Sequence, residues 1–116
     1  MTKSDIRMPT DFYFLFSEDP LRLHEMNGPR GDLIYTFSND FRSNGHLVRL
    51  DADQPGSLEE CRSDTRYTSI IRRPQLTKGT RICVLSRGHV GLVTVREAPQ
   101  ERDDGDFITI DLTVWP

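Results

Sequence analysis

The chain contains two cysteines, Cys61 and Cys83, which can pair in only one way within the chain. A disulfide between them would close a loop of about 20 residues and stabilise the fold by about 3 kcal/mol in the chain-entropy model. Buried free thiols are the alternative, because residues 1–7 lack the apolar core of a secretion signal and reducing compartments keep cysteines unpaired. The disulfide and the pair of thiols therefore both remain open.

The cysteines and the histidines His24, His46 and His89 are the candidate metal ligands. Structural zinc needs four such ligands in a tetrahedron, and no Cys-x-x-Cys or His-x-x-x-His spacing places a pair of them. The acidic run at 101–106 could hold calcium weakly, although a solvated loop is the simpler interpretation. The sequence also lacks a Gly-x-Ser-x-Gly nucleophile turn and a glycine-rich phosphate loop. We therefore predict no catalytic residue, no metal and no cofactor.

Basic residues concentrate between residues 62 and 87, where six arginines and one lysine face a single acidic residue, Asp64. The rest of the chain is acidic, since the net charge is −3. A basic face could bind an acidic protein or another anionic ligand, unless acidic segments pack beside it and neutralise it. Nucleic acid is the weaker candidate because Tyr67 is the only aromatic residue of the stretch. The candidate partner-binding residues are Arg62, Arg66, Arg72, Arg73, Arg81 and Arg87.

The element that would position these residues is the stretch from Thr80 to Val95. Two runs of β-branched and apolar residues flank residues 86–89, where glycine can adopt the positive φ of a tight turn, so a β-hairpin is predicted. Alternation places Ile82 and Val84 on one face of the hairpin and Cys83 on the other. Because the side chains on both faces are apolar, we expect the hairpin to be covered on both sides and to lie at the centre of the fold.

The remaining chain reads as short strands with little helix. Strands are predicted at 11–16, 32–38, 46–50, 67–71 and 107–115. The last of these alternates strictly between apolar and polar residues, which is typical of a half-buried strand. Asn44-Gly45 is the preferred dipeptide of a type I′ turn and predicts a hairpin between Phe41 and 46–50.

Two short helices and one arm complete the prediction. Ser57 and Glu60 have the spacing of a capping box and predict a helix that ends near Ser63. Capping residues and Pro20 predict another helix over 19–27. The polar residues 1–10 are expected to form a flexible arm. We therefore predict one mainly β domain over 1–116, a β-rich sandwich or small barrel with one or two short helices.

The second half of the chain carries a recurring set of residues. These are Cys61, Thr65, Tyr67, Gly79, Cys83, Val84, Gly88, Thr113, Val114 and Trp115. In this order and spacing, residues 55–116 resemble a module of uncharacterised actinobacterial proteins. The module usually has Arg-Thr after its Cys-Val and an arginine after the turn glycine, where this chain has Leu85-Ser86 and His89. The resemblance implies a β-rich accessory or sensory module, sometimes exported with its cysteines paired, and brings no catalytic residue.

From these observations we predict a non-enzymatic interaction or sensory module that presents its basic region to an acidic partner. The alternative is a small-ligand binding protein or enzyme, with a pocket between sheet layers lined by Phe12, Phe14, Tyr35 and Trp115. No apolar run is long enough to span a membrane. The chain is expected to be cytoplasmic if Met1 is the native start, and extracytoplasmic if the cysteines are paired and a leader was removed. The sequence is silent on oligomeric state.

Overall fold

The computed structural model of the protein describes residues 2–25, 30–99 and 107–115. Its strands are β1 (Thr2–Pro9), β2 (Phe12–Phe14), β3 (His24–Glu25), β4 (Leu33–Tyr35), β5 (Phe41–Arg49), β6 (Thr68–Ile71), β7 (Arg81–Ser86), β8 (His89–Glu97) and β9 (Phe107–Trp115). The helical elements are α1 (Leu58–Ser63) and the 3-10 helix η1 (Arg73–Gln75). Antiparallel pairing joins the strands in the order β1-β9-β8-β7-β5-β4-β2-β3, with β6 beside β5.

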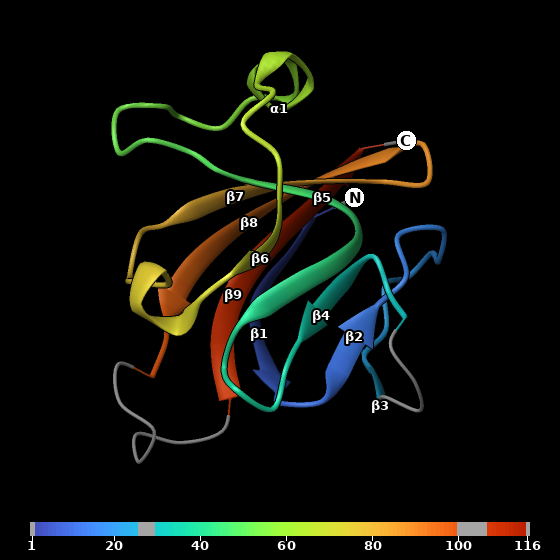
Figure 1. Ribbon diagram of the computed structural model, residues 1–116. Coiled ribbons are helices and arrows are strands. Elements are labelled where there is room, and N and C mark those ends of the chain that lie inside the picture. Colours follow the sequence, from blue (N-terminus) through green and yellow to red (C-terminus); the bar gives the residue numbers. More distant parts are fainter. Residues whose placement is uncertain (1, 26–29, 100–106, 116) are drawn as a thin grey trace.

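The sheet curls into a half-barrel (Figure 1). The predicted mainly β fold with one or two short helices is therefore confirmed, and its form is one curled sheet rather than two stacked sheets. The predicted central hairpin is also confirmed, since β7 and β8 pair from Arg81–Thr94 to Ser86–His89. Arg87 and Gly88 make the turn, both with positive φ. Short loops and antiparallel neighbours thus account for most of the topology.

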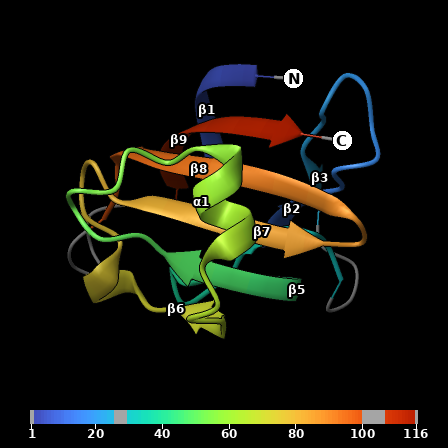
Figure 2. The same ribbon diagram turned by 90° about the horizontal axis from the view of Figure 1, so that it is seen from above.

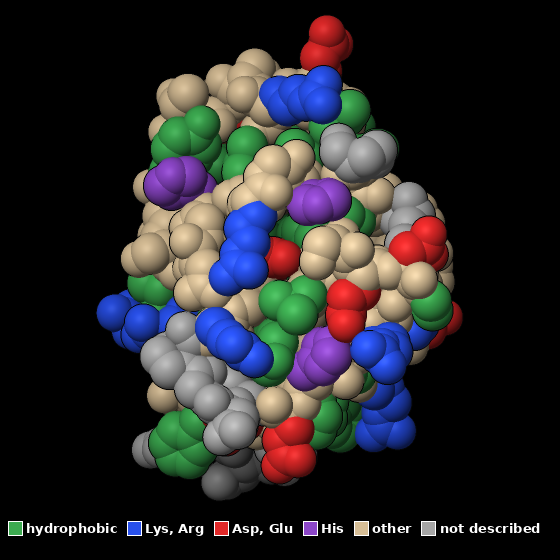
Figure 3. All heavy atoms as spheres, turned by 90° about the vertical axis from the view of Figure 1, so that its right-hand side faces the viewer, with side chains coloured by type: hydrophobic (Ala, Val, Ile, Leu, Met, Phe, Trp, Pro, Cys, Tyr) green, Lys and Arg blue, Asp and Glu red, His purple; other side chains and the backbone are tan. Residues whose placement is uncertain are grey.

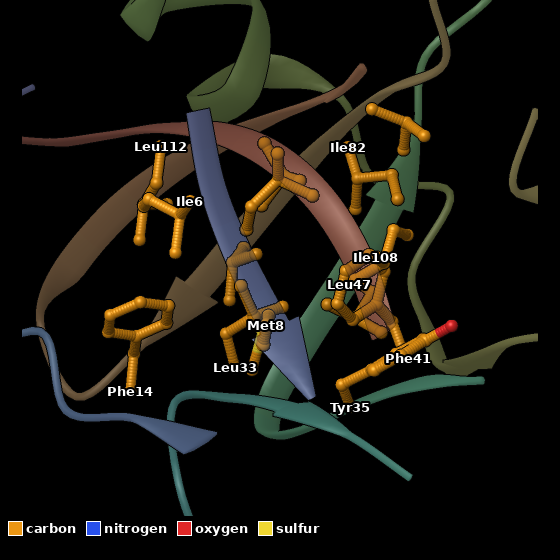
Figure 4. Close-up of a cluster of buried hydrophobic side chains, with 14 of the residues drawn as sticks. Ile6, Met8, Phe14, Leu33, Tyr35, Phe41, Leu47, Ile82, Ile108 and Leu112 are labelled. Atoms are coloured by element: carbon orange, nitrogen blue, oxygen red, sulfur yellow. The ribbon is translucent and has the colours of Figure 1, made fainter. Parts of the chain in front are cut away.

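The concave side of the half-barrel holds the main core. Ile82 and Val84 of the hairpin lie in it, together with every second residue of β9 from Ile108 to Val114, as the alternation predicted. Side chains from β1, β2, β4, β5, β7 and β9 converge on a common centre (Figure 4). A closed apolar interior of this kind is the main source of the fold's stability.

The convex side carries a second, smaller cluster beneath α1. Cys83 faces it from β7, opposite to Ile82 and Val84, so the hairpin is covered on both faces as predicted. The capping box is present, because Ser57 Oγ accepts a hydrogen bond from Glu60 N at 3.1 Å and Glu60 Oε1 accepts one from Ser57 N at 3.0 Å. α1 crosses the outer surface of the sheet (Figure 2). It is fixed there by a disulfide between Cys61 and Cys83, whose Cα atoms are 5.4 Å apart.

The predicted flexible arm is wrong. Residues 2–9 form β1, which pairs with β9 from Thr2–Thr113 to Pro9–Phe107. The apolar signal was weak because only Ile6 and Met8 enter the core. The pairing of β1 with β9 shifts register between Lys3 and Ile6, where Asp5 has a φ of 52°. This shift interrupts the regular alternation of inward and outward side chains along β1.

The predicted helix over 19–27 is also wrong over the part that the structure describes, which ends at residue 25. There the chain forms bends and the two-residue strand β3. Leu21 is buried in the main core, and Glu18 Oε1 lies 2.7 Å from His24 Nε2. A helix of this length is marginal by itself, so tertiary contacts outweigh its capping signals.

The hairpin predicted at Asn44-Gly45 is wrong, because both residues lie inside β5. Here the first half of β5 pairs with β4 and its second half pairs with β7. Asn44 N donates to Gly31 O at 3.0 Å, and Gly45 passes so close to β7 that a Cβ atom would overlap the backbone. The glycine is therefore needed for a close approach between strands and not for a turn.

Candidate functional site

The six arginines predicted to bind a partner do not form one face. Arg81 and Arg87 stand at opposite ends of β7, about 20 Å apart at the usual rise of a strand. Arg72 and Arg73 lie at η1, where Arg73 N donates to Asp40 Oδ1 at 2.8 Å. The Nε atom of Arg73 is buried without a hydrogen-bond partner among the described residues. The cluster of arginines along the chain is therefore not a single cluster in space.

Arg66 is neutralised by acidic neighbours. Its Nη2 donates to Asp64 Oδ2 at 2.7 Å, and its Nη1 donates to Asp51 Oδ1 at 3.1 Å. The hydrogen bonds from Arg66 lower the pKa of Asp64 from 3.8 to about 2. This pairing is the neutralised alternative considered from the sequence, and it removes Arg66 from the free positive surface.

The Asp64 carboxylate predicts a specific pH dependence. Its pKa is lower in the folded chain, so its contribution to stability is complete above about pH 4 and is lost as the pH falls toward 2. We expect Arg66→Gln to be less stable than the wild type at pH 6, and the difference to shrink between pH 4 and pH 2. Urea unfolding at each pH measures it. Arg42→Gln, at an exposed arginine of β5, is the control and should show a constant difference.

Arg87 lies over a buried carboxylate at the tip of the hairpin. Asp32 is 2% exposed, accepts hydrogen bonds from Phe16 N at 2.6 Å and Ser86 Oγ at 2.5 Å, and lies 3.8 Å from Arg87 Nε. The hydrogen bond from the Ser86 hydroxyl to Asp32 anchors the end of the hairpin to the loop before β4. Phe16 N holds the same carboxylate in place. Figure 3 shows this side of the molecule, where histidine, basic and acidic side chains are interspersed with apolar ones.

A row of side chains lies on the convex face beside α1, exposed or partly exposed except at Val90. It contains one residue from each of four neighbouring strands in direct register, His46, Leu85, Val90 and Trp115. Tyr67 extends the row, because its ring stacks on His46 with centroids 4.6 Å apart. We call these five residues the outer strip. At the usual strand spacing the row across the four strands is about 14 Å long.

The outer strip is accessible because α1 is too short to cover it. Figure 2 looks down on the convex face and shows α1 over the middle of β7 and β8, clear of the end of β7 and the start of β8. Tyr67 is 46% exposed, His46 is exposed, and Leu85 and Trp115 are partly exposed, whereas Val90 between them is buried. This site was not predicted from the sequence. The sequence pattern that indicates the site is the alternation along β7, which places Leu85 on the same face of the sheet as Cys83.

Two exposed arginines flank the outer strip, and one of them, Arg87, also lies 3.8 Å from the buried carboxylate of Asp32. Arg62 lies in the last turn of α1, next to Cys61, whose disulfide partner is two positions before Leu85. Arg87 follows β7 at the other end of the same segment, and its side chain is 62% exposed. The convex face therefore combines aromatic and aliphatic surface with positive charge, the composition that is enriched at the centres of protein interfaces.

The alternative pocket lined by aromatic residues is not formed as predicted. Phe14 and Tyr35 are fully buried in the main core, and Phe12 packs against that core. Trp115 packs on the second cluster, on the other side of the sheet. These four residues therefore do not surround a common cavity.

The structure also bears on the candidate metal ligands. Both cysteines are in the disulfide and cannot ligate a metal as thiolates. Within residues 2–25, 30–99 and 107–115, no three His, Cys, Asp or Glu side chains are grouped so that they could hold a metal ion. The acidic run considered for calcium, 101–106, lies outside the described residues.

Comparison with known proteins does not identify a family for this chain. No protein-family model, curated protein or solved structure matches the chain. The resemblance of residues 55–116 to the actinobacterial module therefore stays a prediction. Among the described helices, none has the length and apolar character that crossing a membrane requires.

Proposed function

We propose that this protein is a non-enzymatic interaction module that binds an acidic protein partner on the outer strip. The observation that carries the proposal is the row from Tyr67 to Trp115, at least partly exposed at every residue except Val90, between two exposed arginines. Tyrosine, tryptophan and arginine supply most of the binding energy of protein interfaces, since they combine a large apolar surface with a polar group.

The charge of the partner follows from the surroundings of the strip. Arg62 and Arg87 are exposed, with Arg87 at 3.8 Å from Asp32, whereas Arg66 is held by both Asp51 and Asp64. A partner with acidic residues at the edge of its contact surface would pair with the two exposed guanidinium groups, and an apolar residue at its centre would cover Leu85 and Tyr67. The edge charges would chiefly steer association, and burial of the aromatic rings would hold the complex.

The disulfide supports a compartment for this activity. Cys61 and Cys83 are both fully buried and paired, and disulfides persist mainly in oxidising compartments. We therefore place the proposed interaction outside the reducing cytoplasm. Here the disulfide positions α1, and with it Arg62 and the segment that leads to Tyr67.

Peptide selection tests the proposal. Short random peptides displayed on phage are selected on the immobilised chain, and the enriched peptides are synthesised and measured by calorimetry. We expect enrichment of Asp and Glu around an apolar residue, and weaker affinity as the ionic strength rises to about 0.15 M. Tyr67→Ala should lower the affinity about tenfold or more, and Arg62→Gln should lower it and weaken its salt dependence.

Two matched variants are the controls. Phe37 is 72% exposed and lies outside the strip, between β4 and β5, so Phe37→Ala removes an exposed aromatic ring elsewhere. Arg72→Gln removes an exposed arginine at η1. Both should bind the peptides as the wild type does. Selected peptides without acidic residues, or an equal loss in Phe37→Ala and Tyr67→Ala, would contradict the proposal.

A further inference from the structure

A hollow of about 300 Å³ lies on the part of the molecule where β5 ends and β7 begins. One wall is the end of β5 and the following residues, Arg49 to Ala52, and the other is the turn Thr77–Arg81. Three basic residues line it, Arg49, Lys78 and Arg81, against one acidic residue, Asp51. We propose that this basic hollow binds a small phosphate monoester, such as a sugar phosphate, through its phosphate group.

Arg81 is held in place before any ligand arrives. Its Nε donates to Gln54 O at 2.9 Å, and its Nη2 donates to Ala52 O at 3.1 Å. These two carbonyl groups fix the plane of the guanidinium, and the described residues give its Nη1 no partner. A fixed guanidinium loses little conformational entropy when it binds an oxyanion, which favours binding.

The turn that carries Lys78 is also ordered by its own hydrogen bonds. Thr80 N donates to Thr77 O at 3.0 Å, and Gly79 N donates to Val95 O at 2.8 Å. The hydroxyl groups of Thr77 and Thr80 are 3.0 Å apart on the same wall of the hollow. The wall therefore offers threonine hydroxyl groups at fixed positions next to the lysine, and phosphate oxygens accept hydrogen bonds from hydroxyl and ammonium groups.

The single acidic side chain of the hollow offsets only part of its positive charge. Asp51 is one carboxylate beside three cations, and it shares Arg66 with Asp64. Arg49, Lys78 and Arg81 have no acidic partner among the described residues. Three unpaired cations favour a dianion over a monoanion, so a phosphate monoester fits better than a carboxylate.

The size and lining of the hollow indicate what the phosphate is attached to. A volume of about 300 Å³ is at the lower limit of small-molecule pockets, and it exceeds the room that one phosphate needs. The lining is mainly polar, with Leu50 and Ala52 as its aliphatic residues. A small polar substituent such as a sugar therefore fits, and an aromatic or lipid substituent would leave its apolar surface in water.

Amide chemical-shift mapping on the full chain tests the inference with three probes: ribose 5-phosphate, inorganic phosphate and ribose. We expect ribose 5-phosphate to shift the amides of residues 77–81 saturably, inorganic phosphate to shift the same amides with weaker affinity, and ribose to shift none. The double variant Arg49→Gln/Lys78→Gln should bind ribose 5-phosphate at least about tenfold more weakly. Arg42→Gln, elsewhere on β5, should bind it as the wild type does.

Each of the other outcomes overturns the inference. Equal affinity for inorganic phosphate and ribose 5-phosphate would show a bare anion site without recognition of a monoester. Shifts outside the hollow, or equal binding by the double variant and Arg42→Gln, would place the ligand elsewhere. Arg49, Lys78 and Arg42 are all exposed, so the double variant and the control variant should both fold. Their amide spectra without ligand establish this.

Discussion

Gly45→Ala is expected to lower the free energy of unfolding by about 3 kcal/mol or more, because the added methyl group has no room. A Cβ atom on Gly45 would overlap the carbonyl oxygen of Leu85 and lie 2.8 Å from Cα of Ser86. Both atoms belong to the backbone of β7, so rotation of a side chain cannot relieve the overlap. β5 would have to move away from the central hairpin, at the cost of its pairing over residues 46–49. Urea denaturation of the purified variant measures the loss.

Gly79→Ala is the matched control for this prediction. Gly79 has a φ of 90°, but nothing lies within 4 Å of the position that its Cβ would take. Its replacement therefore costs only the backbone strain of a non-glycine residue at positive φ, about 1 to 2 kcal/mol. If Gly45→Ala is no more destabilising than Gly79→Ala, the close approach of β5 to β7 is not what requires the glycine.

The double variant Cys61→Ala/Cys83→Ala is expected to lose about 3 kcal/mol of stability. The disulfide joins residues 22 positions apart, so its removal restores conformational freedom to the unfolded chain. In the folded chain it removes the covalent link between α1 and β7. The six-residue helix α1 is too short to be stable alone and depends on its contact with the sheet. Urea denaturation gives the loss, and hydrogen exchange should show it first in the amides of α1.

Reductant separates the disulfide from the packing of its side chains. Wild-type protein unfolded and refolded in reductant should approach the stability of the double variant, and reductant should not alter the double variant itself. A wild type whose stability is the same with and without reductant, with both thiols then free to alkylation, would show that the disulfide contributes nothing. Because α1 leads to Tyr67, the double variant should also bind the selected peptides more weakly if the proposed function is correct.

Several elements of this fold follow from short-range chemistry alone. The capping box at Ser57 and Glu60 predicts α1, because both hydrogen bonds form within four residues. The turn at Arg87 and Gly88 and the alternation along 107–115 likewise depend on the residues' own conformational preferences and on which face meets the core. These features are confirmed because the local preferences and the contacts with distant strands favour the same conformation.

Other features were decided only by tertiary structure. β1 forms because β9 offers it a partner, and Leu21 is drawn into the core although its neighbours carry helix signals. Asn44-Gly45 predicted a tight turn, but both residues lie inside β5, where the glycine is required by the close approach of β7. Local propensities are worth about 1 kcal/mol or less per residue, and contacts between distant strands outweigh them.

The candidate sites show the same division. The sequence by itself determined the mainly β fold, the central hairpin, one helix and the excess of arginine between 62 and 87. Only the tertiary structure decided that Cys61 and Cys83 pair and that Arg66 is neutralised by Asp51 and Asp64. It also placed the outer strip and the basic hollow on separate parts of the surface. The physical reason is that charge pairing and exposure depend on distances through space, which the order of residues along the chain does not specify.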